Sequence, residues 1–349
     1  MIIMVIPHSK PTIDISDAIA GFDIIYSGEL ADGDKVWEFE DGMKIYTSRG
    51  YAKCTSSGTT AIQIGLRAQN IGYGDEVVIP SYACYSIVSA VDATGARPVF
   101  ADVGDMTPNI TRETVEKKVT DRTKAIIAPH MFGILAGIED IQDLGVPIIE
   151  DCAQSIGGLD VGSKGEISIL SFYATKIMAC GRGGMILTDN VFLDQRVRDL
   201  MRYDGRERAG ECYNFSMTNI EAAIGCSQLR KLDEFIDKRG MIGDMYDTIL
   251  SYYGLDDLII NRPKGSIVGR YVVRLPKDMN LDGIIEKMYS NGIDCRKPIY
   301  RPLHTYFGLE DFPNTDDAYS RDLSLPAYPS LDMDKVSYIG NKLVEIIKN

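Results

Sequence analysis

The chain has 349 residues, of which 45% are hydrophobic and 25% charged, and this composition is typical of a folded globular protein with about two domains. Its formal net charge of -13 argues against a nucleic-acid-binding surface, which would need a basic patch to neutralise phosphates. No apolar run approaches the roughly 20 residues of a membrane span, and the opening residues 1–7 lack the basic start of a secretory signal, so we expect no membrane partner and no secretion.

Helical patterns and apolar runs alternate along the first part of the chain. Residues 9–27 and 37–49 are predicted to be helical, and short apolar runs follow from Tyr51 onward. The runs that we assign to strands are residues 77–80, 98–102, 125–129, 147–150, 167–172 and 185–188. Because helical patterns separate these runs, they predict a mostly parallel sheet with helices on both faces, which is a three-layer αβα fold.

A smaller domain is predicted to follow this sheet. A helix at residues 193–201, a charged loop at 204–216 and a long helix at 219–239 lead toward it. Its predicted elements are helices at residues 243–253, 281–291 and 333–348, and strands at 267–275 and near 293–297. We therefore expect a large domain at residues 1–236 and a small C-terminal α+β domain at residues 237–349.

The seven cysteines are scattered along the chain without a paired spacing. Disulfide frameworks and zinc sites both depend on regular spacings of cysteine, or of cysteine and histidine. We therefore expect reduced thiols, a cytoplasmic location and no metal site.

A lysine stands between two predicted strands in a glycine-rich segment. Lys176 follows the apolar run at residues 167–172, and Gly183 and Gly184 precede the next run. Desolvation at such a place disfavours the charged ammonium form, and a neutral amine can condense with an aldehyde. Lys176 is therefore a candidate Schiff-base lysine, although most lysines are solvated surface groups.

An aspartate ends another predicted strand. Asp151 follows the apolar residues 146–149 and Glu150, and it precedes a run of small residues. Carboxylates are rarely left at a buried strand end without a partner. The protonated ring nitrogen of pyridoxal 5'-phosphate would be such a partner, because an acidic residue makes that ring a stronger electron sink.

A turn of small residues joins an apolar run to a helical pattern at Ser57, Gly58, Thr59 and Thr60. Free N–H groups and hydroxyls at the start of a helix bind anions, so this turn could hold the phosphate of the cofactor. Ordinary helix capping by Ser57 and Thr59 is the alternative interpretation.

These three segments, in this order and at these separations, resemble the fold type I enzymes that use pyridoxal phosphate. More narrowly, they resemble the DegT/DnrJ/EryC1/StrS family of sugar aminotransferases. The similarity extends along nearly the whole chain and is carried by residues 7–13, 57–61, 72–77, 95–100, 122–127, 150–154, 171–184, 213–215 and 324–326. The resemblance implies the aspartate-aminotransferase superfold.

The resemblance also implies a role for each residue of the cofactor site. Lys176 would hold the cofactor as an internal aldimine and act as a base, Asp151 would pair with the ring nitrogen, and Gln154 would lie near the ring 3-hydroxyl. The implied phosphate contacts are Ser57, Gly58, Thr59, Thr60, Ser171 and, from the neighbouring subunit, Asn214. The active site would then be complete only in a homodimer.

The residue that stacks on the cofactor ring departs from the family pattern. The family usually has an aromatic residue where this chain has Cys84. Tyr82, Cys84 and Tyr85 are therefore alternative candidates for covering the ring.

Further departures concern polar contacts near the substrate. The arginine that is usual two residues after Asn214 is Ser216, and the acidic residue that often precedes the paired glycines is Arg182. His130 matches a family histidine, to which we assign packing and hydrogen bonding rather than catalysis.

The substrate contacts are predicted in the small domain. Arg296, Tyr300, Arg301 and His304 lie in a segment that resembles the family's contribution to a sugar-nucleotide cleft. Arginine suits a nucleotide diphosphate because its guanidinium binds two phosphate oxygens at once. A solvated basic strand end is the alternative for each of these residues.

The resemblance implies an aminotransferase that moves an amino group from L-glutamate onto a nucleotide-linked keto-deoxysugar, in two half-reactions with ping-pong kinetics. Such an enzyme would serve polysaccharide or other glycan biosynthesis. Three alternatives remain. A related sugar dehydratase has histidine in place of the lysine, so Lys176 disfavours it. A non-sugar keto acceptor such as a cyclitol or an antibiotic precursor, and a non-catalytic or regulatory homologue that binds the cofactor, are the others.

Overall fold

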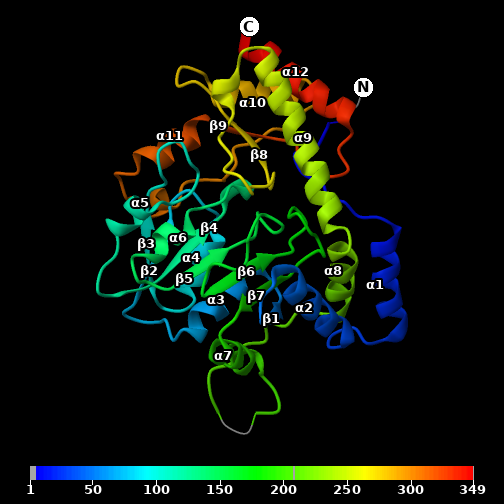
Figure 1. Cartoon of the computed structure of the whole chain (residues 1–349), viewed down its shortest axis with the longest axis vertical. Coiled ribbons are helices and arrows are strands. Elements are labelled where there is room, and N and C mark those ends of the chain that lie inside the picture. The colour runs from blue at the N-terminus through cyan, green and yellow to red at the C-terminus, as the bar shows by residue number, and fades with distance from the viewer. Residues whose placement is uncertain (1–4, 207–208, 349) are drawn as a thin grey trace.

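The computed structural model describes residues 5–206 and 209–348. Within these residues, seven strands form one sheet in the order β1-β7-β6-β5-β4-β2-β3 (Figure 1). The strands are β1 Tyr51–Thr55, β2 Glu76–Pro80, β3 Arg97–Ala101, β4 Thr123–Pro129, β5 Ile148–Asp151, β6 Ile167–Ser171 and β7 Gly184–Thr188. Neighbouring strands are parallel except at β7, which is antiparallel to both β1 and β6. The predicted mostly parallel sheet is confirmed.

The helices lie on both faces of this sheet and in a smaller domain above it. They are α1 Ile15–Ser27, α2 Asp34–Thr47, α3 Gly58–Ala68, α4 Ser86–Asp92, α5 Arg112–Glu116, α6 Ile138–Gln142, α7 Val191–Met201, α8 Asn219–Leu229, α9 Leu232–Tyr252, α10 Leu281–Ser290, α11 Pro313–Arg321 and α12 Met333–Lys348. Short 3-10 helices cover Met131–Gly133, Asp256–Leu258 and Leu303–Phe307. No helix within the described ranges combines the length and the apolar character that crossing a membrane requires.

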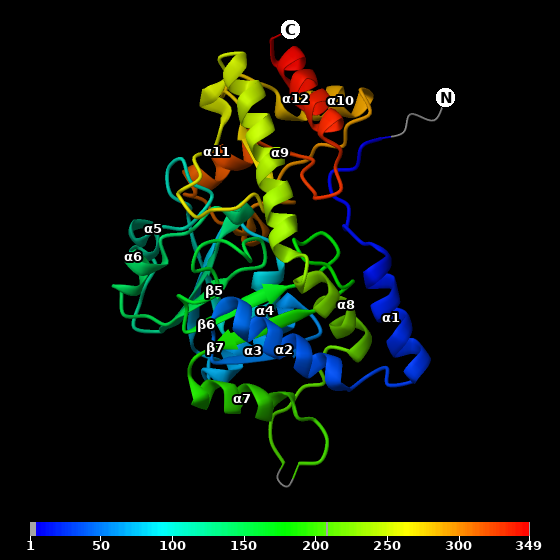
Figure 2. The same ribbon diagram turned by 45° about the vertical axis from the view of Figure 1, so that its right-hand side comes forward.

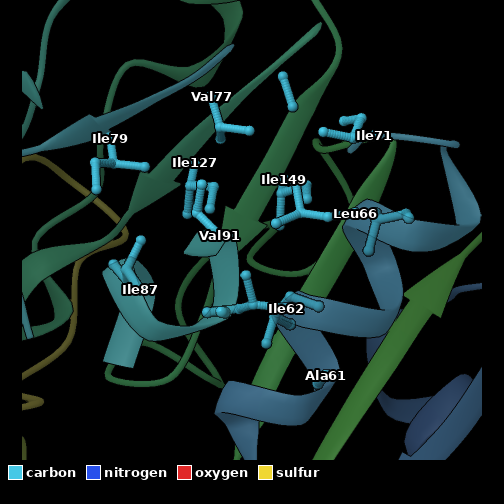
Figure 3. Packing of buried hydrophobic residues seen from close by; sticks show 14 of the residues in the cluster. Ala61, Ile62, Leu66, Ile71, Val77, Ile79, Ile87, Val91, Ile127 and Ile149 are labelled. Atoms are coloured by element: carbon cyan, nitrogen blue, oxygen red, sulfur yellow. The ribbon is translucent and has the colours of Figure 1, made fainter. Parts of the chain in front are cut away.

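The alternation of side chains along the central strands produces the three layers. In β2, Val77 and Ile79 belong to the cluster packed under α3 and α4, whereas Val78 belongs to the cluster beneath α5 and α6. Successive residues of a strand point to opposite faces, so a strand that is apolar throughout is buried on both sides. Figure 3 shows Ile62 of α3 and Val91 of α4 in the first of these clusters.

The small domain is built on the antiparallel strands β8 Tyr271–Arg274 and β9 Asp322–Leu325, with α10, α12 and most of α9 packed around them. Helix α9 extends from the large domain into the small one (Figures 1 and 2). Its Leu232 packs with residues of α2 and α8, and its Tyr246 packs in the core of the small domain. The predicted boundary between residues 236 and 237 falls inside this helix and stays a prediction.

The prediction of one helix at residues 219–239 is wrong. The chain leaves helical geometry at Lys231, which separates α8 from α9, and the helix predicted at 243–253 is the second half of α9. The apolar spacing continues across the break, so the pattern alone does not reveal it.

The strand predicted near residues 293–297 is also wrong. Two isolated bridges, from Ile6 to Ile293 and from Arg296 to Ser324, are formed there instead. Strand β9 has no counterpart among the predicted strands.

A buried ion pair joins β8, β9 and the large domain. Arg274 donates to Asp322 with an Nε–Oδ1 distance of 2.7 Å, and the Tyr82 hydroxyl donates to the other carboxylate oxygen at 2.9 Å. Tyr82 and Asp322 are both fully buried. The cluster therefore fixes the segment after β2 to the small domain.

Replacing Asp322 by Asn should lower the free energy of unfolding by about 3–5 kcal/mol, because Arg274 would keep a buried charge without its carboxylate. Urea unfolding followed by circular dichroism would measure this loss. Lys238→Ala, which removes an exposed ion pair with Glu234, is the control and should cost less than about 1 kcal/mol. Equal losses in the two variants would contradict this role for Asp322.

Candidate active site

A cavity of about 600 Å³ lies where the carboxyl ends of the central strands meet the small domain. Its large-domain lining includes Asp151 at the end of β5, Ser171 at the end of β6, and Lys176 in the loop that follows β6. Its small-domain lining includes Arg270 and residues 298–301. Ligands in open α/β sheets bind at this end of the strands, so the cavity is the candidate active site.

The loop that carries Lys176 is held close to the start of α3. Phe172 N–H donates to Gly183 O at 2.9 Å, and Lys176 N–H donates to Tyr173 O at 2.8 Å. A Cβ at Gly184 would come within 2.4 Å of the Ser57 backbone, so only glycine allows this approach. The two glycine-rich segments are therefore packed together at one side of the cavity.

The Lys176 amine has a lowered pKa. Burial is the main cause, and the positive charge of Arg270 adds to it, whereas the negative charge of Asp151 opposes it. The lowered pKa increases the fraction of neutral amine, which is the nucleophilic and basic form.

Asp151 lies at the end of β5 and faces the same cavity. Its Oδ1 accepts a hydrogen bond from Ala153 N at 3.0 Å. Burial raises the pKa of this carboxyl, and both the Ala153 hydrogen bond and the charge of Lys176 act against the rise. A cationic group bound beside Asp151 would favour its ionised form.

The small-residue turn caps α3 and also lines the cavity. Ser57 is the N-cap, and its side chain accepts from Thr60 N at 3.1 Å while the Thr60 hydroxyl accepts from Ser57 N at 3.0 Å. Ser57, Gly58 and Thr59 line the cavity, but Thr60 does not. Capping and anion binding are thus compatible here. A Cβ at Gly58 would lie 2.9 Å from the Ser171 Cβ, so this turn and the end of β6 meet closely.

Gln154 offers a buried polar atom to the cavity. Its Oε1 is buried and has no hydrogen-bond partner, and its Nε2 lies 3.8 Å from the Met131 sulfur. Buried polar groups are normally satisfied, so this amide fits a ligand that brings its own polar group. Together with Lys176, Asp151 and the turn at the start of α3, the cavity fits pyridoxal phosphate.

The three candidates for covering the cofactor ring differ in whether they face the cavity. Cys84 and Tyr85 line the cavity, whereas Tyr82 does not. The Tyr82 side chain is fully buried, bonded to Asp322 and packed edge-on against Phe132. We therefore keep Cys84 and Tyr85 as the candidates.

The remaining predicted residues lie partly at the cavity mouth and partly outside it. Tyr300 and Arg301 line the cavity, and Tyr300 is almost fully exposed. Arg296 instead pairs with Asp294 and does not line the cavity. His304 is buried, with its Nδ1 at 2.6 Å from the Ser81 hydroxyl and its ring stacked on Phe312, so the structure does not bring it to the site. Asn214 is exposed and also outside the cavity of this chain.

Sequence reasoning assigned no role to Glu150, which precedes Asp151 in β5 and contacts His130 of the cavity lining. This fully buried carboxylate accepts hydrogen bonds from the backbone of Gly162, Lys164 and Gly165, from the Ser168 hydroxyl and from His130 Nε2, at 2.9–3.0 Å. Burial opposes its ionisation, but these hydrogen bonds outweigh burial and lower its pKa to about 2. Period-two alternation could have found it, because Glu150 and Asp151 must point to opposite faces.

His130, Glu150 and Cys152 lie close together, but their donors and acceptors are already in use. His130 Nδ1 accepts from Ala136 N at 2.9 Å, so its Nε2 carries the proton that is donated to Glu150. Burial raises the pKa of the Cys152 thiol well above its ordinary value. These contacts give His130 the packing and hydrogen-bonding role that the sequence suggested, and they do not favour a metal ion.

Comparison with known proteins connects this geometry to a family. The family model for the DegT/DnrJ/EryC1/StrS aminotransferase family matches residues 16–344. The chain belongs to this family. The family resemblance, the fold class and the aminotransferase activity predicted from the sequence are thereby confirmed.

Family members with names or structures agree with this result. The GDP-perosamine synthase of Vibrio cholerae is 30% identical over 96% of this chain and 97% of its own length. The spore coat polysaccharide biosynthesis protein SpsC of Bacillus subtilis is 30% identical over 98% and 97%. The crystal structure of the aminotransferase TlmJ from Streptoalloteichus hindustanus superposes with a TM-score of 0.92, at 29% identity and over 99% of both chains.

A further structure bears on the cofactor. NtdA from Bacillus subtilis, solved with bound cofactor PMP, has a TM-score of 0.89 and 25% identity over 97% of this chain and 83% of its own. The family uses pyridoxal phosphate and its amine form, so the predicted cofactor is confirmed for the family.

Replacing Glu150 by Gln should destabilise the fold by about 2–4 kcal/mol at neutral pH, because the amide brings donors where five donors already point. The pKa of about 2 in the folded protein is below the ordinary glutamate pKa of 4.5, so the carboxylate stabilises the fold above about pH 5 and loses this effect as the pH falls toward 2. The difference in urea midpoint between wild type and variant should therefore shrink between pH 6 and pH 3. A difference independent of pH would contradict this account.

Proposed function

We propose that the protein is a pyridoxal-phosphate aminotransferase that transfers an amino group from L-glutamate to a nucleotide-linked keto-deoxysugar by a ping-pong mechanism. The observation that carries the proposal is that one cavity is lined by Lys176, Asp151, Gln154 and the turn at the start of α3. The names of relatives that are GDP-perosamine synthases support the choice of a nucleotide-linked sugar.

Different residues of the chain would bind the cofactor and transfer protons. Bound pyridoxal phosphate supplies the aldehyde that takes up the amino group and a ring that withdraws electrons from the reacting carbon. Asp151 holds the ring nitrogen in its protonated form. Ser57, Gly58 and Thr59 at the start of α3 would bind the phosphate through backbone N–H groups and hydroxyls, and Ser171 at the end of β6 would add its hydroxyl.

Lys176 attaches the cofactor and then acts as the base. Its lowered pKa keeps part of the amine neutral, so that Nζ can take a proton from the α-carbon of the donor. Nζ would pass this proton to the cofactor, and in the second half-reaction it would take a proton back from the cofactor and deliver it to the acceptor carbon that receives nitrogen. Ping-pong kinetics are expected, because the keto acid formed from the donor would leave before the acceptor binds in the same cavity.

Aromatic and basic side chains at the cavity mouth support a large, anionic acceptor. Tyr85 and Tyr306 pack with ring centroids 4.9 Å apart, and the Arg301 guanidinium lies 4.8 Å from the centre of the Tyr306 ring. Together with the exposed Tyr300, they offer stacking faces for a nucleobase and a guanidinium for phosphate.

Lys176→Ala should abolish the visible absorbance that pyridoxal phosphate gains when it is bound covalently to lysine. Borohydride treatment of the wild type should fix the cofactor mass on the peptide that contains Lys176, and mass spectrometry would detect it. Adding L-glutamate to the loaded wild type should convert the spectrum to that of the amine form. Lys124→Ala, at an exposed lysine, is the control and should behave as wild type. Conversion by the Lys176 variant, or none by the wild type with any common donor, would contradict the proposal.

The site is proposed to be completed in a homodimer. Helix α1 presents Ile15, Ile19, Phe22 and Tyr26 at helical spacing, and each is more than half exposed. Figure 2 shows α1 at the outer edge of the molecule, beyond α8. An exposed apolar stripe of this kind is typical of a subunit interface. The exposed Asn214 would then reach the phosphate of the partner subunit.

Mixing two inactive variants tests this shared site. Lys176→Ala and Asn214→Asp proteins should each be inactive or nearly so, because one lacks the base and the other places a negative charge beside the phosphate. Subunit exchange between them creates heterodimers with one site that has neither substitution, so activity should return. Mixing Lys176→Ala with Lys176→Arg is the control and should restore nothing. Equal activity in both mixtures would exclude a shared site.

A further inference from the structure

Arg270 is a basic residue of the cavity to which the sequence analysis gave no role. It stands directly before β8 and lines the cavity from the small-domain side, opposite the loop of Lys176. The DegT/DnrJ/EryC1/StrS resemblance did not assign it, and none of the cofactor contacts proposed above uses it. Its charge is therefore available to another ligand.

The backbone around Arg270 is firmly placed. Gly269 and Arg270 both donate to Phe132 O, at 2.9 and 3.0 Å, which ties this segment to the large domain. A Cβ at Gly269 would lie 2.0 Å from Gln154 O, so the segment passes directly against the residues of the cofactor site. Arg239, a buried arginine of α9, donates to Gly269 O at 3.1 Å from the other side.

The guanidinium is oriented but not neutralised. Its Nη1 donates to Pro298 O at 3.0 Å, and this bond sets the direction of the side chain. Within residues 5–206 and 209–348, no carboxylate forms an ion pair with Arg270, whereas Arg274 and Arg296, which belong to the same domain but do not line the cavity, pair with Asp322 and Asp294. The positive charges of Arg270 and Arg296 act on each other, and that of Arg270 also acts on Arg239 and Lys176.

A partly buried cation among other cations is costly unless a ligand brings negative charge. Asp151 faces the same cavity, but it is the partner of the cofactor ring. An amino acid has a carboxylate one carbon away from the amine that it gives up. A donor whose amine reacts beside Lys176 therefore has its carboxylate within the part of the cavity between the two domains.

We propose that Arg270 binds the carboxylate of the amino donor and so makes the enzyme selective for α-amino acids over simple amines. This rests on the proposed aminotransferase function and adds a donor-binding residue to it. The guanidinium fork suits a carboxylate, because two parallel N–H groups can meet its two oxygens. The phosphate groups of the acceptor are the other anions that could use the same fork, and the experiment separates the two sources.

The test measures binding of non-reacting anions to the cofactor-loaded protein. Arg270→Gln should weaken the binding of maleate, a dicarboxylate that cannot react, by about 10- to 100-fold, the range for losing charge-assisted hydrogen bonds. Calorimetric titration gives the dissociation constant without any turnover. Binding of a nucleoside diphosphate should change less than threefold. The rate of spectral conversion by L-glutamate should fall with maleate affinity, while the slow conversion by ethanolamine, which has no carboxylate, should stay the same.

Two further variants keep the test decisive. Arg262→Gln removes an arginine from the same loop that pairs with Asp247 and does not line the cavity, and it should leave both affinities unchanged. Arg270→Lys keeps the charge but loses the fork, so its effect on maleate should be intermediate, and cofactor content together with the thermal midpoint shows that each variant is folded.

The opposite results are equally clear. Weaker nucleoside diphosphate binding with unchanged maleate binding would overturn the proposal and assign Arg270 to the acceptor. Unchanged binding of both anions by folded Arg270→Gln, or no maleate binding by the wild type, would also overturn it. Failure of the aminotransferase function itself would show differently, as a wild type that binds maleate through Arg270 but whose spectrum no amino donor converts.

Discussion

The buried carboxylate of Glu150 is the constraint on which the rest of the site depends. Five donors from β6, from the loop between β5 and β6, and from His130 converge on its two oxygens. The loop also packs Cys152, Ile156 and Val161 into the core, and the carboxylate binds its backbone at residues 162–165. Because side chains alternate along a strand, fixing Glu150 on one face directs Asp151 to the other, toward the cavity. Glu150 thus holds the loop behind the strand, and the next residue, Asp151, presents its carboxyl group to the cavity.

The second wall of the cavity belongs to the small domain, so the contacts between domains define the site as much as the sheet does. The Tyr82–Asp322–Arg274 cluster and the hydrogen bonds from residues 267–270 to Phe132 and Gly133 join the two parts. Both contacts start from segments at the carboxyl ends of strands of the large sheet. The same edge of the sheet therefore forms one wall of the cavity and carries the contacts that hold the small domain against it.

The sequence predicts the site best where an ionisable side chain lies at or just after the end of a strand. Lys176 and Asp151 follow apolar runs directly, and parallel strands bring such positions to one edge, so their meeting in one cavity could be predicted. Tyr82 and His304 could not be placed in the same way. Whether a side chain after a strand turns into the cavity or into the domain contact depends on partners far away in sequence, such as Asp322 for Tyr82. The break between α8 and α9 does not show in the sequence, because the apolar spacing continues through it. The place of Arg270 in the cavity does not show either, because it depends on hydrogen bonds from residues 267–270 to Phe132 and Gly133, which are far away in sequence.

Helix α9 has a further consequence for the size of ligand that the cavity accepts. It begins in the core of the large domain and ends in that of the small one, and through Arg239 it supports the segment that carries Arg270. An α-helix is stiff over this length, so α9 fixes the distance between the large-domain wall and the small-domain wall of the cavity. This distance would favour ligands whose reactive atom and charged group are separated by a matching number of bonds. A substitution that bends α9 would therefore change ligand selectivity without altering any residue that lines the cavity.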